Sequence, residues 1–227
     1  MSINAFYNNC YRRFHGSVPK DFSTIAAAYA GRAYHNLEHL EEMLMHYDVA
    51  LQNSTVTASL SWSSSPETSA GATDEQENAG RRSALFGLAL VYHDLVYAAG
   101  RKDNERRSAD ALIDTLRGGA TPEEIAYVDR LIMATKHHVP SHPGAYDEAF
   151  LIDLDLAVLA RDREGYLRYA AGVREEFRRF PGFLYRPGRR RALKGLLAGE
   201  HVYHTEFFRR RYEAVARENL GYEVGTL

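Results

Sequence analysis

Three places along the chain carry histidine or aspartate at spacings that could bind a metal ion. His35 and His39 are four residues apart, so on a helix they would share one face. Imidazoles placed in this way could bind one ion together, or one could bind it while the other donates a proton. His93 and Asp94 are adjacent within an apolar stretch that we expect to be helical. An ionised aspartate is costly to bury alone, so Asp94 should be paired or bound to a metal.

Two further aspartates interrupt the otherwise apolar run 150–159. On a helix Asp155 shares a face with Leu151 and Leu159, so its carboxylate should point inward, whereas Asp153 lies on a different face. An inward carboxylate needs a cation or several hydrogen-bond donors. A metal ion would meet that need, and the capping of a neighbouring helix is a structural alternative.

Two imidazoles and two carboxylates together suit a divalent transition metal such as Mn, Co, Ni, Zn or Fe, whereas Mg prefers ligands that are all oxygen. Polar residues at the start of the helix after Asp94, and at the end of a later helix, could support such a site. Ordinary capping is the alternative for the later group, because helix C-termini favour lysine and histidine. The supporting residues are Asn104, Glu105, Lys136, His137 and His138.

The elements that must position these residues are helices, because apolar residues recur at three- and four-residue spacing along most of the chain. At 121–124 a capping threonine, a proline and a glutamate at the capping-box position predict a helix start. Pro-Gly pairs at 181–182 and 187–188 are expected to bracket a loop. We predict one all-α domain, 1–227, with helices over 21–51 (broken at Gly31), 81–99, 103–116, 121–137, 147–160, 162–179, 189–197 and 204–220.

The segment 52–80 is the exception, since it is rich in serine, threonine, alanine and acidic residues. Such a composition buries too little apolar surface to fix its backbone, so we interpret it as an insertion that is either disordered or a lid. Val56, Ala58, Leu60 and Trp62 alternate with polar residues, which is the pattern of a short hairpin.

The composition argues against several classes of protein. The 227 residues carry a formal net charge of −2, which is not typical of a nucleic-acid binder. No apolar run approaches the roughly 20 residues of a membrane-spanning helix, and the N-terminus has no signal-peptide pattern. The single cysteine, Cys10, cannot form an internal disulfide and fits a reducing compartment. We therefore expect a cytoplasmic protein without a membrane partner, and assembly into a homo-oligomer stays open.

With these residues the chain resembles the HD superfamily of metal-dependent phosphohydrolases, whose pattern is H…HD…D on an all-helical bundle. It is also similar to a family of small bacterial proteins described as predicted HD phosphohydrolases. The resemblance implies an HD-domain-like bundle with a central metal site and phosphomonoesterase or phosphodiesterase activity. The segments that carry it are YHNLEH (34–39), YHDLVY (92–97), NERRSA (104–109), ATKHH (134–138) and DLDLAVL (153–159).

The first of these segments also resembles the YHNxxH motif of cyclic nucleotide phosphodiesterases. This likeness implies that His35 is the general acid and that His39 binds the metal. Alignment with HD proteins that carry a single histidine here would instead make His35 the ligand. The chain lacks that group's second His-Pro-Gly segment and its glutamine-and-aromatic purine clamp, which puts cyclic nucleotide hydrolysis in doubt.

The resemblance implies one tightly bound ion held by His39, His93, Asp94 and Asp155. Asp155 is favoured over Asp153 because Asp155-Leu156-Ala157 resembles an Asp-Leu-Ser stretch of the family. Asp94 could bridge to a second, looser Mg or Mn ion, and Lys136 could neutralise phosphate charge in catalysis. The candidates around the second ion are Asn104, Glu105, His137, His138 and Asp153.

Residues 174–194 contain eight basic and two acidic residues, and arginine forks suit phosphate. Arg186, Arg189 and Arg190 are therefore the candidates for substrate binding, with a solvated helix face as the alternative. We expect a metal-dependent phosphohydrolase that acts on a small phosphorylated metabolite or nucleotide. Two other functions remain open: a catalytically silent sensor that binds a metal or nucleotide, and a di-iron HD oxygenase.

Overall fold

The computed structural model describes residues 1–15, 21–62 and 72–227. Over these residues the fold is all-α, as predicted, with eleven α-helices, one 3-10 helix and no strand. The elements are α1 (Ile3–His15), α2 (Phe22–Tyr29), α3 (Leu37–Ala50), α4 (Ser54–Ser59), α5 (Ala72–Tyr92), α6 (Asn104–Leu116), α7 (Pro122–Thr135), α8 (Tyr146–Leu156), η1 (Ala157–Ala160), α9 (Arg163–Glu176), α10 (Gly182–Ala198) and α11 (Glu206–Thr226).

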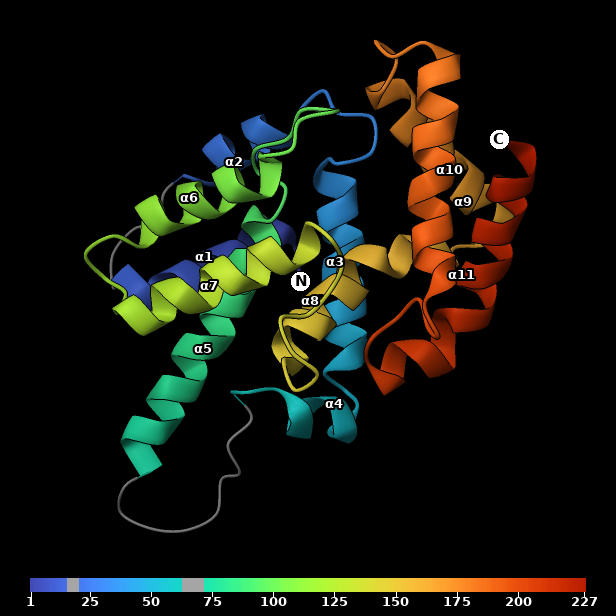
Figure 1. Cartoon of the computed structure of the whole chain (residues 1–227). Coiled ribbons are helices and arrows are strands. Elements are labelled where there is room, and N and C mark those ends of the chain that lie inside the picture. Colours follow the sequence, from blue (N-terminus) through green and yellow to red (C-terminus); the bar gives the residue numbers. More distant parts are fainter. Residues whose placement is uncertain (16–20, 63–71) are drawn as a thin grey trace.

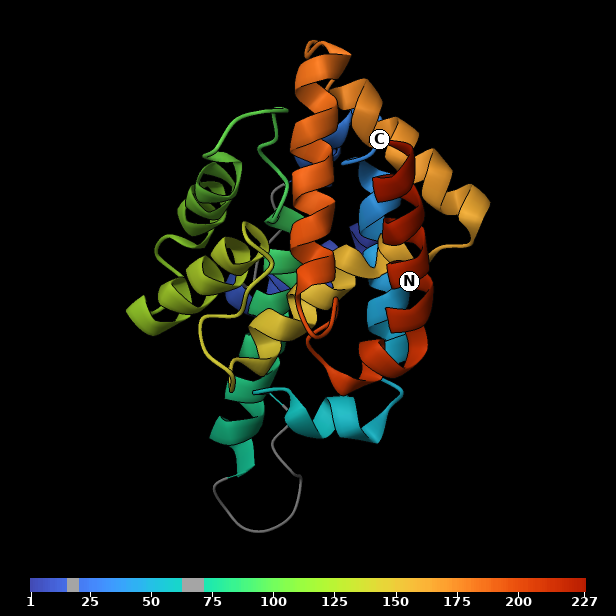
Figure 2. The ribbon, with the colours of Figure 1, turned by 45° about the vertical axis from the view of Figure 1, so that its right-hand side comes forward.

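Helices α3 and α8 lie in the middle of the molecule, where α8 contacts both α3 and α7 (Figure 1). Helix α1 packs along α5, and α6 packs against α7 on the same side. Helices α9, α10 and α11 lie on the other side of α3 (Figure 2). One buried apolar cluster extends from Ile3 to Leu220 across these layers. In the described part of the chain, no helix combines the length and the apolar character that crossing a membrane requires.

The predicted capping box at the start of α7 is confirmed. The Thr121 hydroxyl accepts a hydrogen bond from the backbone N–H of Glu124, and the Glu124 carboxylate accepts one from the backbone N–H of Thr121. Helix α6 ends at Leu116, the predicted end of this helix, and Gly118 shortly after it has a left-handed backbone with φ of 84°. Asp103 precedes α6 as predicted, but its carboxylate pairs with Arg101 rather than capping the helix.

The prediction that His35 and His39 share a helical face is wrong. Helix α2 ends at Tyr29 and α3 begins at Leu37, so His39 is in the first turn of α3 and His35 precedes it. The reason is Asn36, whose side-chain oxygen accepts hydrogen bonds from the backbone N–H groups of Glu38 and His39. Such a cap satisfies the free donors of a helix start, and it therefore begins α3 after His35.

The prediction that His93 and Asp94 lie inside a helix is also wrong, because α5 ends at Tyr92. Tertiary hydrogen bonds hold the chain that follows in a non-helical path. The Arg32 guanidinium donates to the carbonyl oxygens of Asp94 and Leu95 at 2.6 and 2.7 Å, and the Ser108 hydroxyl accepts from the backbone N–H of Val96. Long-range partners of this kind override the local apolar spacing.

Among the described residues of 52–80 the expected hairpin is not formed, and residues 54–59 are helix α4 instead. Val56 and Leu60 are both buried, and their separation of four residues suits a helix as well as an alternating strand. Asn53 caps α4 by accepting from the backbone N–H groups of Thr55 and Val56. Residues 72–80 begin α5, and the rest of the expected disordered or lid segment, 63–71, lies outside the described residues.

The loop expected between the two Pro-Gly pairs is instead the first part of α10, which contains Pro187. A proline inside a helix removes one backbone donor, at a cost of about 3 kcal/mol or more. Tertiary contacts hold α10 in spite of that cost, since Leu193 is buried and Arg189 pairs with Glu223 of α11 at 2.8 Å. The sequence analysis also missed α1, which packs so closely on α5 that a Cβ at Gly87 would lie 2.5 Å from the Cys10 sulfur.

Candidate metal centre

His39, His93 and Asp94 form a group that could hold a metal ion. One ligand atom from each residue lies within 4.8 Å of the others. His39 comes from the first turn of α3, and the other two directly follow α5. Both histidines are buried, with exposures of 2% and 1%. The fold therefore brings together three of the four residues expected to be ligands, from two elements.

The ring of His93 shows most directly that this group fits a cation. Its Nδ1 lies 2.9 Å from the carbonyl oxygen of Leu90, so Nδ1 carries a hydrogen and Nε2 is the nitrogen left to bind either a proton or a metal ion. Within the described structure this buried Nε2 makes no hydrogen bond of good geometry, but it faces two carboxylates, with Oδ2 of Asp94 at 3.3 Å and Oδ1 of Asp155 at 3.7 Å. A nitrogen and two carboxylates buried together need a shared cation between them, because an unsatisfied buried polar atom costs about 1–3 kcal/mol, and either a proton or a metal ion at Nε2 would meet that need.

The ring of His39 is held by hydrogen bonds in a similar way to that of His93. Its Nδ1 lies 3.1 Å from the Tyr34 hydroxyl, and its Nε2 lies 3.1 Å from the Asp155 carboxylate. When a second group holds one ring nitrogen in this way, the other nitrogen is fixed as the ligand. Since His39 rather than His35 belongs to the compact group, the geometry favours His39 as the ligand.

Asp155, the fourth expected ligand, lies beside the two imidazoles. Its Oδ1 is 3.1 Å from Nε2 of His39 and 3.7 Å from Nε2 of His93. Its Oδ2 lies 3.3 Å from Nε2 of His138. His138 has a left-handed backbone, with φ of 52°, and its carbonyl oxygen accepts from the ring of His204. His138 thus contacts Asp155, which in turn lies beside the candidate ligands.

The charges of this cluster are strongly coupled. Burial alone would raise the pKa of Asp94, but the neighbouring His93 and His35 hold it below its usual range. Burial acts in the same way on Asp155, and hydrogen bonds from His138, His39 and His93 hold its pKa well below normal. Burial would lower the pKa of His93, but the two carboxylates raise it well above its usual value. A metal ion must therefore compete with a proton for His93.

His35 lies next to this group and is held by a carboxylate that the sequence analysis did not identify. Its Nδ1 is 2.6 Å from Oε2 of Glu176, the last residue of α9. The other carboxylate oxygen of Glu176 accepts from the backbone N–H groups of Tyr34 and His35. The ring stacks on Tyr97 at a centroid distance of 3.9 Å. Its Nε2 faces Asp94 at 3.9 Å.

The pKa of Glu176 also reflects this contact. Burial would raise it, but the hydrogen bonds from His35 and from the backbone hold it below its usual value. A weak signal for this residue was present in the sequence, since Glu175 and Glu176 are the sole acidic residues of the basic segment 174–194. Nothing local indicated which of the two would turn toward His35.

Arg32 is a second residue that the sequence analysis missed. Its guanidinium donates to the backbone carbonyl oxygens of His35, Asp94 and Leu95, and it lies 4.8 Å from the ring centroid of Tyr29. It thus joins the segment that carries His35 to the segment that carries Asp94. Its neighbours in the sequence gave no sign of this role, because the carbonyl partners are set by the tertiary fold.

Asp153 does not lie at the metal centre, which corrects its expected place near a second ion. It is fully buried and accepts hydrogen bonds from the backbone N–H groups of His204 and Thr205 and from the Thr205 hydroxyl. Burial raises the pKa of Asp153 to about 7. Helix α11 begins directly after Thr205. Asp153 therefore has a structural role: it holds the two residues that directly precede α11 and does not cap the helix itself.

The other expected supporting residues lie around the segment that follows Asp94. The Asn104 amide both donates to and accepts from the backbone of Ala98, so it shapes that segment. The Lys136 ammonium donates to the carbonyl oxygen of Lys102. Glu105 is half-buried in the first turn of α6, and His137 is exposed after α7. The described contacts of Asn104 and Lys136 are thus with the backbone and not with the candidate ligands.

The arginines expected to bind substrate are on α10. Arg189 is half-buried and forms a two-pronged ion pair with Glu223, at 2.8 and 3.0 Å. Its charge is therefore already neutralised, and its assignment to the substrate is not supported by its geometry. Arg186 and Arg190 are exposed to solvent.

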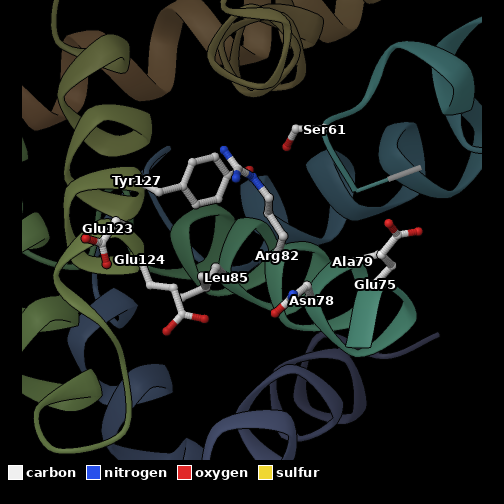
Figure 3. A pocket seen from close by; sticks show the side chains of 9 residues that line it. All are labelled: Ser61, Glu75, Asn78, Ala79, Arg82, Leu85, Glu123, Glu124 and Tyr127. Carbon is white, nitrogen blue, oxygen red and sulfur yellow. The ribbon is translucent and has the colours of Figure 1, made fainter. Parts of the chain in front are cut away.

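Two hollows of similar size differ in their relation to the site. The first, of about 330 Å³, borders His35, because Glu176 and Tyr97 contribute to its wall. The residues that line this hollow are Gly31, Arg32, Ala33, Tyr97, Ala98, Ala99, Glu175, Glu176, Arg178, Arg179 and Phe180. The other, of about 370 Å³, lies between α5 and α7, where Arg82 covers the ring of Tyr127 (Figure 3). No candidate ligand is among its described lining residues.

Comparisons with protein-family models, curated proteins and solved structures found no match to this chain.

Proposed function

We propose that this protein is a metal-dependent phosphohydrolase that acts on a small phosphorylated substrate such as a nucleotide or related phosphoester. The observation that carries the proposal is the group of His39, His93 and Asp94, in which the buried Nε2 of His93 faces the carboxylates of Asp94 and Asp155. This donor set suits a divalent transition metal such as Mn, Co, Ni, Zn or Fe. When bound, such an ion lowers the pKa of a bound water and polarises a phosphoryl oxygen.

His35 is the proposed general acid. Glu176 holds Nδ1 of His35 at 2.6 Å, so the hydrogen on the opposite nitrogen, Nε2, is free to move to the leaving oxygen of the substrate. Tyr97 stacks on the ring and limits its rotation. Glu176 acts through His35 and is therefore a positioning residue.

The leaving group of the substrate would lie on the side of the site where the general acid stands. The hollow of about 330 Å³ adjoins His35 through Tyr97, which stacks on its ring, and through Glu176, which contacts Nδ1. The leaving oxygen itself would have to lie at Nε2, the nitrogen that faces Asp94. Arg179 and Phe180 also line it, and arginine with an aromatic ring suits a leaving group that carries an anionic or planar portion. We propose these residues for substrate contact in place of Arg186, Arg189 and Arg190.

The proposal is tested with metal-free protein reconstituted separately with Mn, Co, Ni, Zn or Fe. Phosphate release from nucleoside monophosphates and other phosphoesters is expected with at least one ion, and the His93→Ala variant should lose it. His201→Ala is the matched control, because this histidine is exposed and distant in sequence from the candidate ligands. Bound metal without phosphate release from any substrate would contradict hydrolysis and favour a sensor. A di-iron centre that consumes oxygen would favour an oxygenase.

A further inference from the structure

The turn between α9 and α10 forms a tip that projects beyond the rest of the fold in both views (Figures 1 and 2). We use the name α9–α10 tip for residues 177–194, which are the projecting turn and the part of α10 that runs back from it beside α11. Nine large apolar side chains are exposed in the described part of the chain, and three of them lie within 180–184 of this tip. Phe183 is 74% exposed, Leu184 56% and Phe180 37%. Scattered exposed apolar residues are normal, but a cluster of them requires an explanation.

The exposure of these side chains does not come from a loosely held turn. The Arg174 guanidinium donates to the carbonyl oxygens of Phe177 and Phe180 and lies 4.7 Å from the ring centroid of Tyr185. The rings of Phe177 and Tyr185 are 5.8 Å apart. These contacts turn Phe177 and Tyr185 inward, and Phe183 is left with its ring in solvent.

The same tip is strongly cationic, although the whole chain has a net charge of −2. No acidic residue occurs between Glu176 and Glu200. Two of the tip's cations are neutralised within the protein, Arg178 by Glu175 and Arg189 by Glu223. Five other cations are exposed: Arg179, Arg186, Arg190, Arg191 and Lys194.

We propose that the α9–α10 tip docks the protein on the surface of an anionic lipid bilayer. Phe183 and Leu184 would enter the boundary between headgroups and acyl chains, while the exposed arginines contact lipid phosphates and carboxylates. Apolar side chains within a cationic surface are the combination that peripheral membrane contacts use. The proposal departs from the sequence-based expectation of no membrane partner. A peripheral contact needs no membrane-spanning helix, and it does not depend on the candidate metal centre.

The charge of the tip argues against two other occupants. A second copy of the chain joined tip to tip would place like charges together, which opposes association. A nucleic acid would use the arginines but would leave Leu184 without a role, because an aliphatic side chain cannot stack on bases as an aromatic ring does.

Co-sedimentation with vesicles tests the proposal, using phosphatidylcholine alone and phosphatidylcholine mixed with phosphatidylserine. The full chain should bind the anionic vesicles, and added salt should weaken that binding. The double variant Phe183→Ser, Leu184→Ser should lower the affinity by about tenfold or more, since it removes the apolar part of the contact. Neither residue lines the hollow beside His35, so phosphate release should stay unchanged.

The matched control is Leu167→Ser, Val215→Ser, which removes two apolar side chains that are 42% and 41% exposed on α9 and α11. It should bind anionic vesicles as the parent protein does, and circular dichroism checks that both double variants are folded. Equal loss in the control would overturn the proposal, as would no binding of the parent protein at low salt. Binding of single-stranded RNA without vesicle binding would overturn it in favour of a nucleic-acid contact.

Discussion

At the scale of single residues, the candidate site is defined by what each ring nitrogen faces. His93 and His39 each have one nitrogen held by the protein, while the other points toward the carboxylates of Asp94 or Asp155. His35 has the same arrangement, with Glu176 as the holding group. Two imidazoles could thus hold an ion, and in the proposed function the third, His35, would transfer a proton beside it.

The proposed role of His35 predicts a large loss of activity when His35 itself is replaced and a smaller loss when Glu176, which positions it, is replaced. His35→Ala should lower kcat by about 10²-fold or more, because it removes the general acid. Glu176→Gln should lower kcat less, and both variants should bind metal as the parent protein does. Steady-state kinetics with measured metal content checks this. Glu175→Gln is the control, since the adjacent Glu175 pairs with Arg178 and not with His35. An equal effect of both glutamate variants would contradict the assignment.

The raised pKa of His93 predicts that metal affinity depends on pH. Burial opposes the charged form, but Asp94 and Asp155 raise the pKa above its usual value. In the metal-free protein His93 therefore stays protonated at higher pH than a free histidine. As pH falls below that raised pKa, affinity for Zn or Mn should fall by about tenfold per pH unit for each displaced proton. Calorimetric titration at several pH values measures this, and a flat profile would rule out displacement of the proton.

At the scale of elements, the sequence predicted helices whose ends depend on local chemistry. The start of α7 followed from its capping box, and the end of α6 from Gly118. Prediction from the sequence failed where residues distant in sequence determine the path of the chain. An example is the end of α5, where Arg32 donates a hydrogen bond to the carbonyl oxygen of Asp94. For the site, His39, His93 and Asp94 could be predicted from residue type and resemblance, but Glu176 could not, because its contact spans a large separation in sequence.

Substitution of the two aspartates of α8 should have different effects, on stability for Asp153 and on metal binding for Asp155. Asp153→Ala removes the acceptor for three donors at the start of α11, so the free energy of unfolding should fall by about 2–3 kcal/mol. Asp155→Ala should instead weaken metal binding, since Asp155 contacts His39 and His138. Chemical denaturation and metal titration of both variants check this. Loss of metal binding in a folded Asp153→Ala variant would place Asp153 at the site after all.

At the scale of the whole molecule, the candidate site lies where separate parts of the fold meet. Helix α3 supplies His39, the segment after α5 supplies His93 and Asp94, α8 supplies Asp155, and α9 supplies Glu176. Each of these residues can reach the site because the helices share one buried core. The α9–α10 tip begins directly after Glu176, the last residue of α9.

Metal content is the measurement that tests the central claim most directly. The full chain, purified without chelator and then reconstituted with Mn or Zn, is compared by elemental analysis with the double variant His93→Ala, Asp94→Ala. We predict about one equivalent of tightly bound ion in the parent protein and its loss in a variant that circular dichroism shows to be folded. A parent protein that binds no ion after reconstitution, or a variant that binds as much, would contradict the account.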